Sequence, residues 1–132
     1  MDIEKEISLL KDQVKLLKSM VNGEDFPFFM FALDFNFKEM QMKAIVKILS
    51  AFKKRLEGKD LQVIKEDYLI LEEYGIPLSK LLVNELPSVE EFDNYLESIV
   101  AKKSFRTKYL LNSIKKQHIH SDVCSYLLDQ LN

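Results

Sequence analysis

Six of the nine phenylalanines in this 132-residue chain stand within one twelve-residue stretch. They are Phe26, Phe28, Phe29, Phe31, Phe35 and Phe37. A helix over this stretch turns Phe28 and Phe31 to one side and Phe29 toward another, so both faces require apolar partners. Phenylalanines at helical spacing are most often core residues. We therefore expect a short, buried, Phe-rich helix at the centre of the fold, covered by neighbouring helices or by a second copy of the chain.

The composition favours a single all-α domain over residues 1–132. The chain is 47% hydrophobic and 30% charged, with three glycines and three prolines, and it is long enough to bury a core of its own. We expect a compact bundle of five to seven helices. A single cysteine excludes an internal disulfide, and no early apolar stretch has the length of a signal peptide or a membrane span. We therefore expect a cytoplasmic protein without a membrane segment.

The N-terminal segment carries a heptad pattern. Asp2 is positioned to cap a long helix that Asn22 and Gly23 would end. Apolar residues recur in it at spacings of 4, 3, 4 and 3, and these residues, here called the interface stripe, are Ile3, Ile7, Leu10, Val14 and Leu17. Fewer than three full heptads make a short coiled coil, so this helix needs tertiary or intersubunit packing. We expect this helix to pack across the Phe-rich helix or to pair through the stripe with a second chain, with a homodimer favoured.

Capping signals divide the rest of the chain into further helices. Asp25 precedes the Phe-rich helix, and the Asn36–Glu39 spacing is that of a capping box that opens a long amphipathic helix with Gly58 as its stop. Later segments show the same signals. They are a helix from Asp60 to Tyr74, one or two turns from Leu78 to Val83, and helices that begin at Ser88, at Ser104, and at Ser121 or Asp122.

The N-terminal half resembles the YhaI-like family of small bacterial proteins. The resemblance rests on the heptad helix, the run Asp25-Phe26-Pro27-Phe28-Phe29, the pair Leu33-Asp34 and the capped helix that follows. It covers roughly residues 1–57, with a weaker echo at 86–96, while the spacing around 97–105 and an extension over 118–132 depart from the family pattern. The resemblance implies an all-helical fold. The family has no assigned activity to carry over, but its prophage-encoded versions imply a regulatory role.

One cluster near the C-terminus contains residue types used in metal binding and catalysis. In a helix His118 and His120 would point about 200° apart, so a shared metal ion is not expected there. Cys124 follows His120 by four positions, and Asp122 lies between them. A catalytic cysteine needs an exposed thiol of low pKa. Cys124 follows the apolar Val123, which favours a buried structural thiol. We expect a polar turn between two helices, with no metal, no cofactor and no enzymatic activity.

Charge is segregated along the chain. Residues 60–100 hold 2 basic and 10 acidic residues, a net of −8, and residues 101–120 hold 6 basic and no acidic residues. These segments could complement each other, join protomers head to tail, bind charged partners or simply be solvated helix faces. The basic residues, with Phe105 and Tyr109 between them, are candidates for nucleic-acid contact. They are Lys102, Lys103, Arg106, Lys108, Lys115 and Lys116.

Two functions follow as hypotheses from these patterns. The favoured one is a non-enzymatic regulatory or adaptor protein that acts by protein–protein interaction, and the prophage link extends it to binding or inhibiting a host or phage regulatory protein. The alternative is a nucleic-acid-binding regulator that uses the basic segment 102–116, with a helix that begins at Ser104 as its recognition helix. The formal net charge of −2 argues against strong nonspecific binding to DNA.

Overall fold

The computed structural model describes residues 2–21, 24–58 and 65–131, and these residues form helices joined by short turns. The described residues contain no strand, which confirms the predicted all-α class. None of the described helices is both long and apolar enough to cross a membrane. The helices are α1 (Ile3–Met20), α2 (Pro27–Asp34), α3 (Glu39–Glu57), the 3₁₀ helix η1 (Lys65–Tyr74), α4 (Leu78–Leu81), α5 (Val89–Ile99), α6 (Thr107–Lys116) and α7 (Ser121–Gln130).

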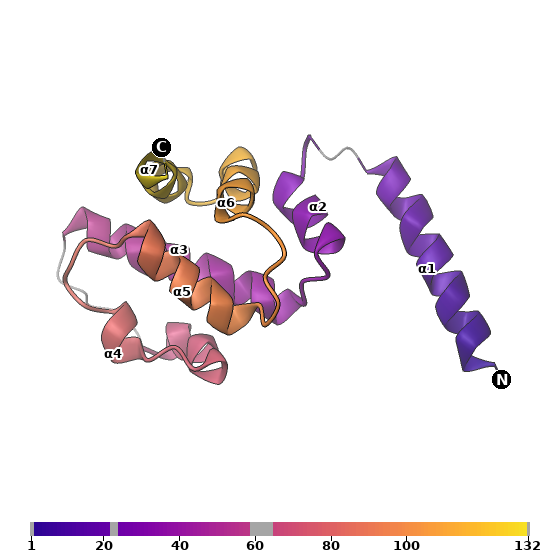
Figure 1. Ribbon diagram of the computed structural model, residues 1–132, viewed down its shortest axis with the longest axis horizontal. Coiled ribbons are helices and arrows are strands. Elements are labelled where there is room, and N and C mark those ends of the chain that lie inside the picture. Colours follow the sequence, from indigo (N-terminus) through magenta and orange to yellow (C-terminus); the bar gives the residue numbers. More distant parts are fainter. Residues whose placement is uncertain (1, 22–23, 59–64, 132) are drawn as a thin grey trace.

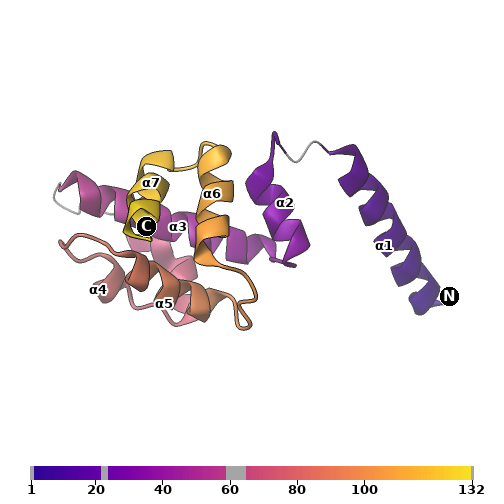
Figure 2. The same cartoon turned by 45° about the horizontal axis from the view of Figure 1, so that its top comes forward.

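Helix α3 is the centre around which the other helices pack. In Figures 1 and 2, α5 lies on one side of it and α6 and α7 lie on the other. Its sequence explains this position, because apolar residues occupy more than one face of the helix. The buried apolar residues of α3 are Ala44, Ile45, Ile48, Leu49, Ala51 and Phe52. Helices α5, α7 and η1 contact α3 directly, which makes α3 the central helix of the described part of the chain.

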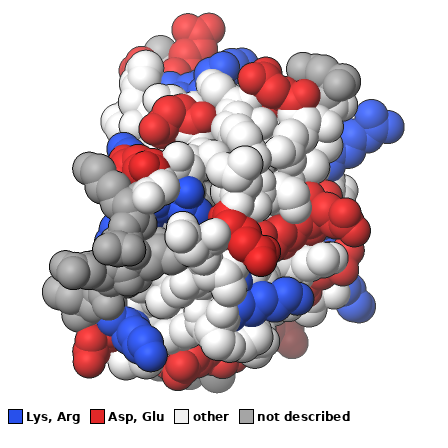
Figure 3. Space-filling model, turned by 90° about the vertical axis from the view of Figure 1, so that its left-hand side faces the viewer, with Lys and Arg blue, Asp and Glu red and all other residues white. Residues whose placement is uncertain are grey.

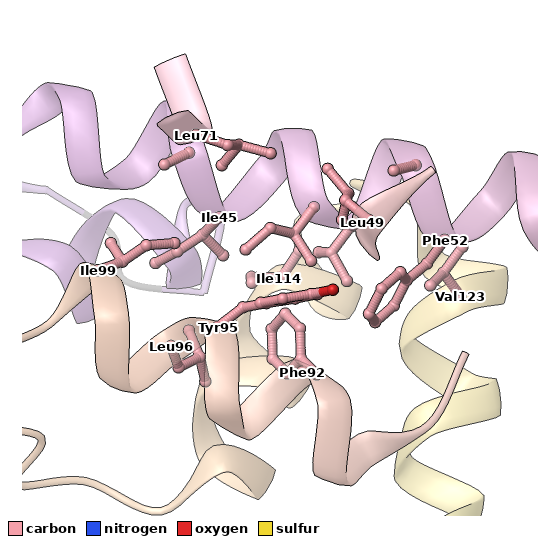
Figure 4. Packing of buried hydrophobic residues seen from close by; sticks show 14 of the residues in the cluster. Ile45, Leu49, Phe52, Leu71, Phe92, Tyr95, Leu96, Ile99, Ile114 and Val123 are labelled. Atoms are coloured by element: carbon pink, nitrogen blue, oxygen red, sulfur yellow. The ribbon is translucent and has the colours of Figure 1, made fainter. Parts of the chain in front are cut away.

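The core between α3 and α5 is built from large side chains that point toward each other. Figure 4 shows Phe52 of α3 facing Phe92 and Tyr95 of α5. The Phe52 ring lies 6.2 Å from each of these two rings, measured between centroids. Phe52 and Phe92 are fully buried, and burial of such a side chain contributes roughly 1.5–3 kcal/mol. This α3–α5 contact therefore supplies a large share of the hydrophobic stabilisation.

The prediction that the Phe-rich helix is the buried centre is wrong. In α2 only Phe28 and Ala32 are buried, whereas Phe29 and Leu33 are 47% and 48% exposed. Figures 1 and 2 place α2 at the edge, between α1 and the remaining helices. A helix of 8 residues is too short to contact every other helix, while α3 has 19. Three of the phenylalanines instead surround one ring, that of Phe105, at centroid distances of 5.2 to 5.5 Å; they are Phe31, Phe35 and Phe37.

Three helices do not begin as the sequence predicts. Asp25 does not cap α2, because the Gln117 side-chain oxygen accepts hydrogen bonds from the backbone N–H groups of Phe28 (2.9 Å) and Phe29 (3.2 Å). Asn36 does not open α3 either: it has a positive φ of 58°, and α3 begins after Lys38. Helix α6 begins at Thr107 instead of Ser104.

Other local predictions are confirmed. The Asp2 carboxylate accepts from the backbone N–H groups at the start of α1, and the Ser88 hydroxyl accepts from Glu91 N at 3.1 Å. Gly58 ends α3 in the left-handed conformation, with φ of 67°. The predicted helix from Asp60 is a 3₁₀ helix over 65–74. Its proposed cap at Asp60, like the Asn22–Gly23 stop, lies outside the described residues.

A buried ion pair joins α3 to α5 and to the segment after α4. The Arg55 guanidinium donates to both carboxylate oxygens of Glu91, at 2.6 and 2.9 Å. It also donates to the backbone carbonyls of Leu81 (3.3 Å) and Glu85 (2.9 Å), and the Tyr95 hydroxyl donates to Glu91 at 2.8 Å. Burial, and then the Glu91 carboxylate, raise the pKa of Tyr95, so the hydroxyl keeps its proton. These hydrogen bonds replace the ones that the two charged groups would form with water if they were exposed.

We expect Arg55→Ala to lower the free energy of unfolding by about 3–5 kcal/mol, because it leaves the Glu91 carboxylate without its cation in a largely buried site. Urea unfolding followed by circular dichroism measures this loss. Lys43→Ala is the matched control: it removes an exposed ion pair to Glu39, at 3.3 Å, and should cost less than about 1 kcal/mol. Equal losses for the two variants would contradict this role for Arg55.

Candidate protein-interaction surface

Helix α1 presents the interface stripe to solvent. The stripe residues are exposed to the extent of 66% for Ile3, 46% for Ile7, 60% for Leu10, 45% for Val14 and 60% for Leu17. The spacing of 4, 3, 4 and 3 places them on one face of the helix, as the sequence predicts. No side chain of α1 is buried by the described part of the chain. The stripe is therefore a continuous apolar surface that the single chain leaves open.

A narrow contact connects α1 to α2. The Lys18 ammonium lies 2.7 Å from the Asp34 carboxylate, and both side chains are partly exposed. Such a pair contributes about 0–1 kcal/mol. Beside it is a crevice of about 280 Å³ lined by Val21, Phe26, Phe29, Met30 and Leu33. The outer face of α2 thereby extends the apolar surface that the stripe begins.

A second apolar surface, here called the α3 groove, was not predicted from the sequence. It has a volume of about 720 Å³ and lies between α2, α3 and η1. Its apolar lining consists of Phe28, Phe29, Met42, Val46, Ile70 and Ile119. The sequence does contain one signal for this groove, which is the set of extra apolar residues, such as Val46, that widen the apolar face of α3. The sequence could not show that four separated segments, namely α2, α3, η1 and the turn that contains Ile119, would leave a groove between them.

The two sides of the α3 groove carry opposite charges. On the α3 side are Lys43, Lys47 and one carboxylate, Glu39, and on the η1 side are Glu66 and Asp67. Lys43 pairs with Glu39, and the Lys47 ammonium lies 5.7 Å from the centre of the Tyr68 ring. Glu66 and Asp67 are exposed and form no ion pair with the described residues. The groove thus combines an apolar floor with an acidic border on its η1 side.

The basic segment is divided between a structural and an exposed group. The Lys103 ammonium donates to Asp93 (3.2 Å) and to the Thr107 hydroxyl (2.7 Å), and this hydroxyl in turn donates to Asp93. Lys103 is therefore part of the contact between α5 and α6. The remaining five residues are exposed, and none of them forms an ion pair with the described residues; they are Lys102, Arg106, Lys108, Lys115 and Lys116.

The exposed face of α6 brings part of this group together. Lys108, Asn112 and Lys115 follow one another at spacings of 4 and 3 and so share a face, next to Tyr109, which is 57% exposed. The following helix α7 adds Asp122 and Asp129 and has no lysine or arginine. On the end of the molecule opposite α1, the largest charged cluster among the described residues is acidic (Figure 3). The exposed basic residues of segment 102–116 therefore lie on α6 and in the turn before it, and α7 does not extend them.

The His–Cys cluster lies in the turn between α6 and α7 and in the first turn of α7. His118 and His120 both have positive φ, 62° and 43°, in the turn between α6 and α7, which confirms the predicted turn. Burial, and then the charge of Lys53, lower the pKa of His120. Burial, and then the charge of Asp122, raise the pKa of the Cys124 thiol to about 12. No group of three or more His, Cys, Asp or Glu side chains within the described residues could hold a metal ion.

Comparison of the chain with protein-family models, with curated proteins and with solved structures finds no match. The resemblance to the YhaI-like family therefore stays a prediction. The described residues leave three surfaces open to a partner, namely the interface stripe, the α3 groove and the basic face of α6.

We expect Cys124 to be unreactive in the folded protein. A thiol whose pKa is raised to about 12 is almost entirely protonated at neutral pH, and the thiolate is the nucleophile. Ellman's reagent at pH 8 should label native protein slowly and should label guanidinium-unfolded protein rapidly, as an ordinary cysteine. Rapid labelling of the native protein would contradict the burial of this thiol.

Proposed function

We propose that this protein is a non-enzymatic regulatory or adaptor protein that acts through protein–protein contacts, with α1 as its contact element. The supporting observation is the interface stripe, whose side chains are 45% to 66% exposed on a helix that the described chain leaves unburied. A large exposed apolar patch marks an interaction site in a soluble protein. A helix of 18 residues without tertiary packing is also only marginally stable, so a partner would stabilise it.

The first partner in this proposal is a second copy of the chain, with a dimer favoured. A second copy carries the same open stripe, and a two-fold arrangement covers both stripes at once. The resemblance to YhaI-like proteins extends the proposal to a prophage-associated protein that binds or inhibits a host or phage regulatory protein. The proposal places the protein in the cytoplasm, where a free thiol such as Cys124 stays reduced.

We expect Leu10→Glu to weaken self-association at least about 100-fold, because a carboxylate replaces a leucine at the centre of the stripe in both copies. Sedimentation velocity at micromolar concentration measures the change, and circular dichroism checks that the fold is kept. Lys5→Glu, on the opposite face of α1, is the control and should associate like the wild type. A wild-type protein that remains a monomer would refute the dimer.

A second candidate function is nucleic-acid binding by the exposed face of α6. The observation that favours it is the shared face of Lys108, Asn112 and Lys115, with Tyr109 beside them. Lysines can contact phosphates there, and an exposed aromatic ring can stack on an unpaired base. Lys103 has no part in this surface, because its ammonium is bound to Asp93 and Thr107.

We expect the triple variant Lys108→Glu, Lys115→Glu, Lys116→Glu to lose at least about tenfold in affinity for nucleic acid if α6 is the binding surface. Fluorescence anisotropy with labelled duplex DNA and single-stranded RNA, at about 50 mM salt, measures this affinity. Lys80→Glu, on α4, makes a single charge reversal at an exposed position away from α6 and should leave the affinity unchanged. Absence of binding by the wild type under these conditions would eliminate this candidate.

A further inference from the structure

The molecule has two open apolar surfaces of complementary form. One is convex, the interface stripe on α1, and the other is concave, the α3 groove. An amphipathic helix in an apolar groove is a common mode of protein recognition, with anchor residues at helical spacing along the groove. We propose that α1 of a second copy of this chain occupies the α3 groove, and that the two copies exchange their α1 helices reciprocally. This inference rests on the proposed function and identifies the surface that the stripe contacts.

Charges along α1 match those beside the groove. Lys11 and Lys15 each follow a stripe residue by one position, about 100° around the helix, so they border the stripe on one side. The residues one position before the stripe residues contain no lysine or arginine; they are Asp2, Glu6, Leu9, Gln13 and Leu16. A stripe inserted into the groove can therefore present its lysines to the η1 side and Glu6 to the α3 side.

The groove has the opposite arrangement. Glu66 and Asp67 on η1 form no ion pair with the described residues, while Glu39, Lys43 and Lys47 line the α3 side. Lys11 and Lys15 of one copy would form ion pairs with Glu66 and Asp67 of the other. Matching charges on both borders also fix which way round the helix lies, which apolar contact alone would not.

The α3 groove adjoins the crevice between α1 and α2. Phe29 lines the α3 groove on one side and the α1–α2 crevice on the other. In Figures 1 and 2, α2 separates α1 from the rest of its own chain. An α1 helix from a second copy would thus extend the apolar surface that begins at Val21 and Phe26. A two-fold axis then gives two identical contacts and leaves neither stripe uncovered.

The α3 groove is a more favourable binding site for α1 than the α1 helix of a second chain. The stripe spans fewer than three heptads, which is short for a stable free coiled coil. The groove offers side chains from three helices that the core already holds in place, so less conformational entropy is lost on binding. An α1–α1 coiled coil would also leave the apolar floor of the groove open.

Charge reversal separates these arrangements. The variant Glu66→Lys, Asp67→Lys should weaken the dimer at least about tenfold, because two attractions become repulsions in each of two contacts. The variant Lys11→Glu, Lys15→Glu should weaken it equally. The matched control is Glu72→Lys, Glu73→Lys, which makes the same change at exposed positions of η1 outside the groove and should dimerise like the wild type.

Mixing the two weakened variants gives the decisive measurement. In a reciprocal dimer of one copy of each, wild-type α1 meets a wild-type groove and reversed α1 meets a reversed groove, so both contacts are attractive again. Sedimentation velocity of the equimolar mixture should show recovery of the dimer. The chain with all four substitutions should also dimerise, and circular dichroism confirms that each variant is folded.

Two outcomes would overturn the inference, and they differ from failure of the proposed function. If Glu66→Lys, Asp67→Lys dimerises like the wild type while Leu10→Glu does not, the stripe contacts a surface other than the groove, and the proposed function stands. If the variants weaken the dimer but their mixture does not recover it, helix exchange is wrong. If the wild type is a monomer, both the dimer and the exchange are wrong.

Discussion

The ion pair between Arg55 and Glu91 is the interaction on which the arrangement of the bundle depends. Arg55 lies near the end of the central helix α3 and Glu91 in the first turn of α5, so the pair fixes these helices at one register. The same guanidinium holds the backbone of the segment after α4 through two carbonyl groups. Apolar contacts between α3 and α5 are numerous but not directional, whereas two parallel N–H···O bonds accept only one geometry. The pair thus selects one packing among the many that hydrophobic burial would allow.

Once that packing is fixed, the molecule consists of a closed part and an open part. The core residues of α3, α5, α6 and α7 are fully enclosed, whereas α1 contributes nothing to the core. An amphipathic helix whose apolar face stays in water does not gain the hydrophobic stabilisation that burial of this face would give. This contrast supports our proposal that the chain acts through α1 and the α3 groove.

The sequence predicted those features that depend on neighbouring residues. Asp2 and Ser88 cap helices whose first N–H groups are two or three positions away, and the stripe follows from helical periodicity alone. It failed where the partner is distant, since the acceptor at the start of α2 is Gln117, 89 positions from Phe28. The Phe-rich helix was placed at the centre because density of apolar residues does not reveal position, which depends on length and on neighbours such as Phe105. The α3 groove exists only once four separated segments are assembled.

The exposure of α1 has a consequence for the abundance of the protein. If α1 binds a partner as proposed, it is protected for the fraction of time that it is bound, and this fraction rises with the concentration of the partner. At low copy number α1 would be exposed to proteases and chaperones, since segments with few buried contacts open first. Synthesis above a threshold would therefore lengthen the lifetime of each molecule, and the dosage of the protein would help to determine its own persistence.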